Sequence, residues 1–448
     1  MKSIQMCAAA FLLLNGQVDV QGQQQTALRP ESVESTLRYL ASDAMAGRDT
    51  PSLQQEEAAV YIARRFAAAG LKPGGKNGSW FHIYELDGKE WDPEGLRLSV
   101  HSARGKAKLE GGKDFRLWRA GGELQMKGVE AVRLDASTAG SKGLMPGRRS
   151  KAPILIEVGE ESPLWKGRVG AWQSLSRRFR SRGAPWLLVR RGVLPKGELS
   201  IDLTIPKPKD VRLKLKNVVG LLKGGKRSSE YVLVSSHYDH IGIAFNAGGD
   251  FINNGADDDG TGTTAVMHLA DSLKESGTKL DRSVAFVCFS GEEKGLLGSN
   301  AFAETPPFPL KNVAVNINIE MIGRPKAGEE NQAWVTGRSL SDFESIVTEG
   351  LKAAAVKMVT SKMGERLFRA SDNYSLASRG VVAHSISAGY MHPDYHRPTD
   401  EVDRIDFVHM TQIIRGIREG LILFGNREKR PAYNEAGKKA TTNRRRRR

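Results

Sequence analysis

The sequence predicts an α/β fold: a three-layer α/β/α sandwich around a mixed, mostly parallel sheet, with an inserted, smaller β-rich domain. In the C-terminal half, short apolar runs alternate with stretches of helical periodicity, an order typical of parallel strands joined by helices. Between residues 87 and 209 the pattern changes to short apolar runs separated by Gly, Lys and Arg, which indicates a separate β-rich unit.

Individual elements follow from local signals. A helix is expected over residues 30–40, which open with Pro-Glu-Ser, and Ser52 is a suitable N-cap for a second helix over 53–69 that Gly70 ends. The remaining elements that we expect are the strands 231–236, 283–290, 314–319 and 381–386 and the helices 261–276 and 341–355.

Length and composition are those of a globular protein with more than one domain. The chain has 448 residues, 40% of them hydrophobic and 26% charged. Its two cysteines are Cys7, in the N-terminal apolar stretch, and Cys288, in a predicted core strand. We therefore expect neither an intrachain disulfide nor a thiolate metal ligand.

The N-terminus has the composition of a secretory signal. Lys2 precedes an apolar run over residues 6–14, and polar residues follow through Gln25. The run is too short to span a membrane. We expect residues 1–22 to be a signal peptide, no transmembrane segment, and an exported protein that is periplasmic, attached to the cell surface or extracellular.

Half of the net charge of +16 lies at the C-terminus. Residues 426–448 contain ten Lys or Arg and two Glu, a local charge of +8. Because this segment has few apolar residues, we expect a disordered basic tail. No basic patch with interleaved aromatics accompanies it, so no specific nucleic-acid partner is expected.

Candidate ligands follow the predicted strands. The carboxyl ends of parallel strands meet at one edge of a sheet, where sites form in open α/β folds. The polar residues just beyond these strands should therefore lie close together, although they are far apart in sequence. They are His237, Glu292, Glu293 and Glu320.

Imidazoles mixed with carboxylates, with no thiolate nearby, suit a hydrolytic pair of zinc ions. Asp258 lies in a Gly-flanked acidic turn and is the best candidate to bridge two Zn²⁺. His237 and Glu320 would complete one metal, and Glu293 and His396 the other. Four positive charges then face three carboxylates and one hydroxide, a balance that favours a partly buried site.

Three further residues have predicted roles. Glu292 is adjacent to a ligand and is the candidate general base, which takes a proton from the metal-activated water and passes it to the leaving amine. Asp239 is the candidate partner that orients an imidazole. Tyr395 precedes His396 and is a candidate donor to the tetrahedral intermediate, with a packing role as the alternative.

Five motifs resemble the co-catalytic zinc exopeptidases, the family that includes bacterial leucyl aminopeptidases and glutamate carboxypeptidase. They are HYDHIG, GADDDGTG, EEKGLLGS, EMIGR and YHRPTDEVDRID, and the similarity covers roughly residues 217–407. The resemblance implies two zinc ions per chain and peptide substrates, with Asp258 bridging, Glu292 as base and Glu293 as ligand. The insert occupies the place of that family's protease-associated domain, and the LASDAMAGRD stretch before it is also similar.

The chain departs from the family pattern at three places. Glu320 replaces a frequent Asp, and this longer side chain should still reach a metal. Asn373 stands where the family often has His, and Thr261 replaces a usual Ser. Among the other histidines, His392 competes with His396 as a ligand. The ones that we expect to be structural are His240, His268 and His384.

The function that we expect is that of an exported two-zinc exopeptidase, an aminopeptidase acting at the N-terminus of peptides. Its catalytic domain comprises residues 23–86 and 210–425, and the insert comprises 87–209. Three alternatives remain: a carboxypeptidase of the same family, which needs an Arg-lined pocket; a glutaminyl-cyclase-like acyltransferase with one zinc; and a non-catalytic binding protein, which the complete ligand set disfavours.

Overall fold

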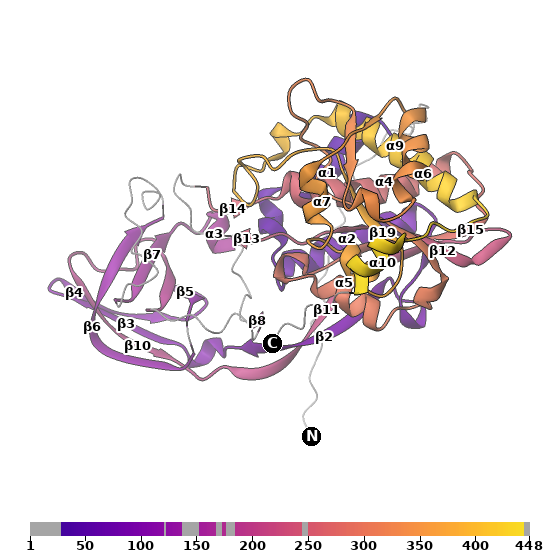
Figure 1. Ribbon diagram of the computed structural model, residues 1–448. Coiled ribbons are helices and arrows are strands. Elements are labelled where there is room, and N and C mark those ends of the chain that lie inside the picture. The colour runs from indigo at the N-terminus through magenta and orange to yellow at the C-terminus, as the bar shows by residue number, and fades with distance from the viewer. Residues whose placement is uncertain are drawn as a thin grey trace, which may run out of the picture.

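The computed structural model describes residues 28–120, 122–136, 152–166, 173–175, 184–243 and 250–442. The predicted signal peptide 1–22 and the terminal arginine run 444–448 lie outside these ranges. Within them, no helix combines the length and the apolar character that a membrane span needs. Figure 1 shows a large lobe of helices around a sheet and a smaller lobe built of strands.

The sheet of the large lobe is mixed, as predicted, and its four central strands run parallel. These four are the strands that the sequence predicts, in the order β19 (Ala383–Ser387), β16 (Val313–Ile319), β12 (Arg227–His237) and β15 (Arg282–Phe289). Other strands extend the sheet on both sides: β11 (Lys209–Leu222), β2 (Phe81–Glu90), β8 (Gln173–Leu175), β1 (Lys72–Pro73), β17 (Gln332–Val335) and β18 (Lys357–Met358).

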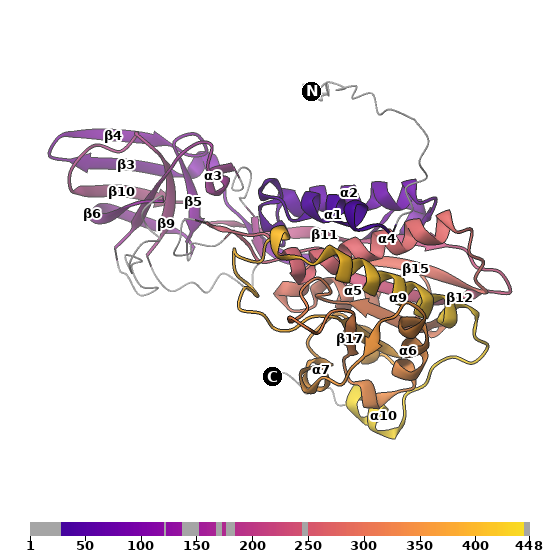
Figure 2. The same ribbon diagram turned by 90° about the horizontal axis from the view of Figure 1, so that it is seen from above.

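Successive residues of the central strands enter two different cores. In β12, Val232 and Val234 pack into one core, and Leu233 packs into the other. This alternation is what a sheet covered on both faces requires, since neighbouring side chains point to opposite sides. The three-layer α/β/α arrangement is therefore confirmed, and Figure 2 shows helices above and below the strands.

The helices divide between these two cores. The helices of the first core include both predicted N-terminal helices, and Ser52 caps the second of them by accepting the Gln55 backbone N–H at 3.0 Å. They are α1 (Pro30–Leu40), α2 (Leu53–Ala68), α4 (Gly262–Glu275), α6 (Phe343–Ala353) and α9 (Phe407–Asn426). The second core contains residues of α5 (Leu297–Glu304) and α8 (Asn373–Ala377).

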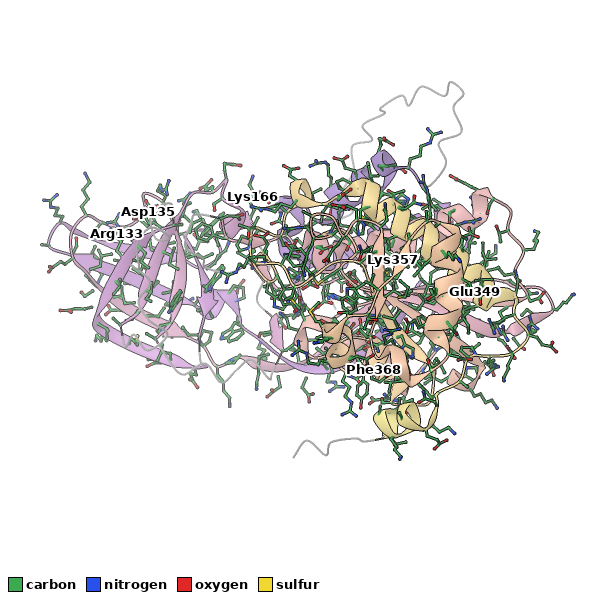
Figure 3. All side chains as sticks on the ribbon, turned by 45° about the horizontal axis from the view of Figure 1, so that its top comes forward. Arg133, Asp135, Lys166, Glu349, Lys357 and Phe368 are labelled. Carbon is green, nitrogen blue, oxygen red and sulfur yellow. The ribbon has the colours of Figure 1, made fainter. Side chains whose placement is uncertain are left out.

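The smaller lobe has a sheet and a core of its own, and a second core that it shares with Phe251 and Ile243 of the following segment. Arg133 and Asp135, labelled in Figure 3, extend from one of its strands and form ion pairs with Glu157 (2.6 Å) and Arg191 (2.7 Å). Its strands, in spatial order, are β4 (Gly105–Glu110), β3 (Arg97–Ser102), β10 (Leu199–Ile205), β6 (Leu124–Asp135), β7 (Ile154–Val158), β9 (Trp186–Arg190) and β5 (Phe115–Arg119).

A two-stranded ribbon joins the lobes. β2 and β11 pair antiparallel without a break, from Phe81 opposite Val218 to Glu90 opposite Lys209. One end of the ribbon lies within the large sheet, and the other leads into the small lobe (Figure 1). The predicted boundaries at 87 and 209 therefore fall within or at the end of these strands rather than in a flexible linker.

The C-terminal segment differs from the predicted disordered tail. Its described part, through residue 442, is folded: Tyr433 forms a bridge with Ser341, and its hydroxyl accepts the Ala383 backbone N–H at 3.0 Å. Helix α10 (Glu435–Thr442) follows, with Gly437 and Thr441 buried. The high charge of this segment did not predict disorder correctly, because Lys438 and Lys439 are exposed to solvent. The contacts with the rest of the protein are made by Tyr433, Gly437 and Thr441.

Deleting residues 433–448 is therefore expected to lower Tm by at least a few degrees. The deletion removes Tyr433 and α10 and exposes the apolar surface that they cover. We expect the free energy of unfolding to fall by roughly 2 kcal/mol. Deleting only 443–448 is the matched control and should leave Tm unchanged. Differential scanning calorimetry of the two truncations checks this, and equal Tm values would show that α10 does not stabilise the fold.

Candidate metal centre

The first candidate ligand ends a central strand. His237 is the last residue of β12, and its imidazole is buried. Its Nδ1 donates to the backbone carbonyl of Asp239 at 3.0 Å, which fixes the ring and turns Nε2 toward the edge of the sheet. Nε2 lies 3.5 Å from Oε2 of Glu320, the residue that follows β16.

Glu320 reaches the site despite the longer side chain noted in the sequence. Its Oε1 accepts hydrogen bonds from Asn318 (2.9 Å) and Ser371, which leaves Oε2 to face His237. Asn373, in the position where the family often has His, instead donates to the Phe368 carbonyl and accepts from Ser385, both at 3.0 Å. Asn373 therefore supports the local fold and contributes no ligand.

The acidic turn presents one carboxylate and uses the others to hold the backbone. Asp400 accepts the backbone N–H groups of Asp257 and Asp258, each at 3.1 Å. Asp259 accepts the N–H groups of Gly262 (3.1 Å) and Met321 (3.2 Å). Asp257 likewise accepts the Gly323 backbone N–H at 2.8 Å, whereas Asp258 Oδ2 is buried without a hydrogen-bond partner, so Asp258 is the carboxylate that the turn offers to the site.

Asp258 lies between two groups of candidate ligands. Its Oδ1 is 3.3 Å from His237 Nε2, and its Oδ2 is 3.1 Å from His396 Nε2. On the second side, Glu293 Oε1 lies 3.2 Å from His396 Nε2. One carboxylate oxygen therefore faces each group, the arrangement that a bridging ligand requires. The ligand atoms of His237, Asp259 and Glu320 lie within 4.8 Å of one another, and so do those of His240, Asp258, Glu293 and His396. The structure therefore brings the predicted ligands together, with Asp259 and His240 as additional members of the two groups.

The two adjacent glutamates occupy different environments. Burial, together with the charges of Asp372 and Glu320, raises the pKa of Glu292 well above its usual range. At Glu293, burial and the charge of Asp258 act to raise the pKa. The imidazoles of His240 and His396 outweigh them and lower the pKa of Glu293 to about 2. Paired carboxyls whose pKa values are pushed apart are typical of sites that use one as a proton carrier.

Asp239 orients the His237 imidazole through its backbone carbonyl, whereas its carboxylate has other partners. Its carboxylate is 3.9 Å from His237 Nδ1, too far for a hydrogen bond. It accepts the Glu292 backbone N–H (3.1 Å) and the Thr50 hydroxyl (3.0 Å) instead. Asp239 therefore positions the loop that carries Glu292, and its backbone carbonyl, not its carboxylate, orients the imidazole.

Of the other candidate residues, Tyr395 lies beside the candidate ligands, and three histidines lie away from them. The Tyr395 ring stacks on His396, with centroids 3.9 Å apart, and lines the pocket beside the ligands. His392 is buried with Nε2 3.3 Å from Asp257, away from the ligand atoms. His268 and His384 bond to Thr36 (2.9 Å) and Ser341 (2.7 Å) and are structural, as expected.

Arg48 is a buried residue that sequence reasoning did not single out, although it lies in the LASDAMAGRD stretch. Only 1% of it is exposed, and its guanidinium donates to backbone carbonyls rather than to a carboxylate. Burial lowers its pKa to about 10. Its acceptors are the carbonyls of Leu40 (2.5 Å), Tyr238 (2.9 Å), Asn254 (2.8 Å) and Gly255 (3.0 Å). Arg48 thus joins helix α1 to the segments that carry His237 and Asp258.

A pocket opens beside the ligands. His237, Asp258, Glu292 and Glu320 form its acidic wall. Among the described residues that line it, none is Lys or Arg. The lining also includes large apolar and aromatic side chains: Met321, Trp334, Met363, Leu367, Tyr390 and Met391.

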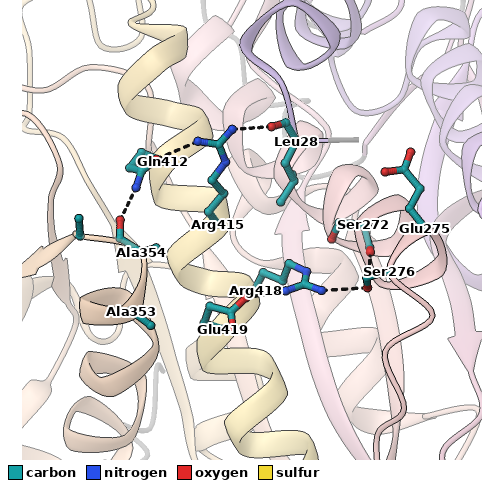
Figure 4. A pocket seen from close by; sticks show the side chains of 11 residues that line it. Leu28, Ser272, Glu275, Ser276, Ala353, Ala354, Gln412, Arg415, Arg418 and Glu419 are labelled. Atoms are coloured by element: carbon teal, nitrogen blue, oxygen red, sulfur yellow. Dashed lines mark hydrogen bonds and ion pairs between the residues drawn. The ribbon is translucent and has the colours of Figure 1, made fainter. Parts of the chain in front are cut away.

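A second hollow, drawn in Figure 4, lies between α4, the end of α6, and α9. Arg415 donates to the Leu28 carbonyl (2.8 Å) and to Gln412 (3.0 Å), and Arg418 donates to Ser276 (2.8 Å). Because the protein itself engages these guanidinium groups, the hollow is not a candidate anion site.

The donor set fits a metal of the zinc type. Imidazole nitrogens and carboxylate oxygens are ligands that Zn²⁺ accepts. Asp258 Oδ2 and Glu293 Oε1 are buried and have no hydrogen-bond partner. Buried carboxylate oxygens without partners are costly, and a cation between them removes that cost.

The chain is similar in sequence and fold to known peptidases. Residues 217–420 match peptidase family M28. The resemblance to zinc exopeptidases is confirmed by this match, which covers the part of the chain that contains every candidate ligand. Aminopeptidase YwaD of Bacillus subtilis is 27% identical over 221 residues, 46% of this chain and 45% of that protein.

Leucine aminopeptidase 1 of Ajellomyces capsulatus is 26% identical over 269 residues, 57% of this chain and 62% of that protein. The matched region thus spans about half the length of these M28-type relatives. The structure of a zinc aminopeptidase from Bacillus subtilis has a TM-score of 0.52 at 18% identity and covers 91% of this chain and 97% of its own. An aminopeptidase from Aneurinibacillus sp. strain AM-1 gives 0.50 at 16%, covering 90% and 95%, and both show the fold.

Proposed function

We propose that this chain is a zinc-dependent aminopeptidase that holds two metal ions. The observation that carries the proposal is the position of Asp258, which offers one oxygen to the group of His237 and Glu320 and the other to the group of Glu293 and His396. A single-zinc acyltransferase does not need a shared carboxylate between two donor groups, so the geometry favours the two-metal alternative.

Zinc bound in such a site acts as a Lewis acid toward a carbonyl and lowers the pKa of water. The chain supplies the proton transfer. Glu292 Oε2 lies 4.0 Å from His237 Nε2, and the side chain is 14% exposed, so it can reach both the site and a substrate. From this position its carboxylate can accept a proton from the attacking water and pass it to the leaving amine.

The pocket supports exopeptidase action at the N-terminus. A free α-amino group is cationic and is attracted to the acidic wall, whereas a C-terminal carboxylate needs a cationic partner that the described lining lacks. The apolar lining with Trp334, Met363 and Met391 favours a large hydrophobic first residue. Tyr395 lines the same pocket and is the proposed donor to the tetrahedral intermediate.

A substrate panel tests this proposal. Leucyl and phenylalanyl p-nitroanilides are expected to be cleaved faster than the lysyl and aspartyl compounds, and N-acetyl-leucyl p-nitroanilide should be resistant. Cleavage of N-blocked peptides from their free C-terminus would favour the carboxypeptidase alternative. Conversion of N-terminal glutamine to pyroglutamate without hydrolysis would favour the cyclase.

Metal removal has a defined expected result. Purified protein should contain about two zinc ions per chain, measured by plasma mass spectrometry, and dialysis against 1,10-phenanthroline should abolish turnover. Added Zn²⁺ should restore it. The metal-free protein should also melt at a lower temperature, because the buried carboxylates then repel one another. Full activity in a sample without transition metals would contradict the proposal.

Export is part of the proposal, since the composition of residues 1–22 matches a secretory signal. N-terminal sequencing of the protein recovered outside the cytoplasm should give a start near residue 23. Recovery with Met1 intact would contradict it.

A further inference from the structure

His240 stands out because both of its ring nitrogens are buried without a hydrogen-bond partner. The residue is wholly enclosed, with 0% of its side chain exposed. A buried imidazole that satisfies neither nitrogen is costly, and such groups in folded proteins need an explanation. By comparison, the buried His384 uses both nitrogens, toward Ser341 (2.7 Å) and Thr336 (2.7 Å).

The surroundings of His240 consist of candidate ligands. Its Nδ1 lies 2.8 Å from Glu293 Oε1 and 3.9 Å from Asp258 Oδ2. Its ring meets that of His396 edge-on, with centroids 5.5 Å apart. Nδ1, Oε1 and Oδ2 all lack a hydrogen-bond partner despite these short separations. Without an ion, His240 can pair only with Glu293 among the described residues, and imidazole nitrogen and carboxylate oxygens at these separations are suitable ligands of one shared cation.

The backbone holds the ring in this position. His240 lies three residues beyond His237, in a short segment that is neither helix nor strand. Gly255, with φ +58°, lies against the imidazole, and a Cβ there would come within 2.5 Å of His240 Cγ. Any larger residue at 255 would displace the ring, so the acidic turn is shaped around His240.

We propose that His240 is a protein ligand of the metal held by Asp258, Glu293 and His396. Ligand atoms of these four residues all lie within 4.8 Å of one another. The inference rests on the proposed metal centre and adds an asymmetry to it. One metal receives four protein donors, a set typical of tightly held structural zinc, and the other receives His237, Glu320 and Asp258. The four-donor site is therefore the tighter one.

X-ray absorption at the zinc edge tests this on the unaltered protein. Metal-free full-length chain is loaded with one equivalent of Zn²⁺, which should fill the four-donor site. Two imidazoles per zinc are expected, from His240 and His396. One imidazole would overturn the assignment of His240 while leaving a metal centre in place, whereas a chain that takes up no zinc would overturn the proposed function as well.

A variant gives an independent measurement. His240→Asn, titrated with Co²⁺ by calorimetry and visible absorption, should lose the tighter class of site, with affinity weakened by at least roughly a hundredfold, and show an altered cobalt spectrum. His384→Asn is the matched control, since it removes another buried histidine, and should keep both. Unchanged affinity and spectrum in a folded His240→Asn protein would refute the proposal.

Discussion

Glu292→Gln is expected to retain about two zinc ions while turnover falls roughly a hundredfold to ten-thousandfold, the usual contribution of a general base. The amide has the size of the carboxyl but cannot accept a proton from water. The fold should persist, because the contact that Asp239 makes in this loop is to the Glu292 backbone N–H rather than to its side chain. Metal analysis and steady-state rates on the same sample check both parts of the expectation.

Glu293→Gln is the matched control and should give the opposite pattern. Glu293 Oε1 faces His240 and His396, and an amide is a poor zinc ligand, so one metal should weaken or leave. Zinc loss in the Glu292 variant with retention in the Glu293 variant would reverse the two roles. Near-normal activity in both variants would remove this pair from the site.

Arg48→Lys should destabilise the protein by about 3–5 kcal/mol, the cost typical of breaking a buried charged network. Lysine keeps the positive charge but lacks the planar guanidinium with its several N–H donors. Its single ammonium group cannot donate to the carbonyls of Leu40, Tyr238 and Asn254 at the same time. We expect Tm to fall by roughly 5–15 °C and zinc affinity to drop, because the turn that carries Asp258 loses a support.

Arg38→Lys is the control for this substitution. Arg38 lies on α1 and pairs with Glu34 at the exposed surface (2.7 Å), where such changes cost about 0.5 kcal/mol or less. Calorimetry of the two variants, with zinc titration of each, provides the comparison. Equal Tm values would show that Arg48 does not hold the turn.

The central strands and the positions of the candidate ligands were predictable because both depend on the buried apolar runs of the parallel strands. Buried parallel strands read as apolar runs, and the sheet edge where they end is fixed by the fold class. His237 and Glu320 adjoin such runs directly, so each could be placed without knowing the loops. The acidic turn was predictable for a different reason, since its flanking glycines mark it.

The side-chain directions of Asp239 and His240 could not be predicted because the stretch after β12 has no periodicity. Without a helix or strand, sequence spacing does not indicate which way a side chain points. The Asp239 carboxylate therefore turned out to hold the Glu292 backbone N–H, and His240 lies among the ligands. The C-terminal segment was misjudged because bulk charge does not reveal single anchoring residues such as Tyr433.

The ribbon of β2 and β11 has a consequence for how the chain can be cut and rejoined. Glu90 and Lys209 face each other, so the chain leaves and re-enters the large lobe at neighbouring points. In topological terms residues 91–208 occupy the tip of a β-hairpin, which a two-residue Asn-Gly turn closes in many proteins. A folded insert holds its own two ends close together. Pairing β2 with β11 therefore costs less chain entropy than it would if residues 91–208 were a flexible loop. The small lobe is thus an insertion at a hairpin tip that also contacts the large lobe through β8 and Phe251, whereas every candidate ligand lies C-terminal to it.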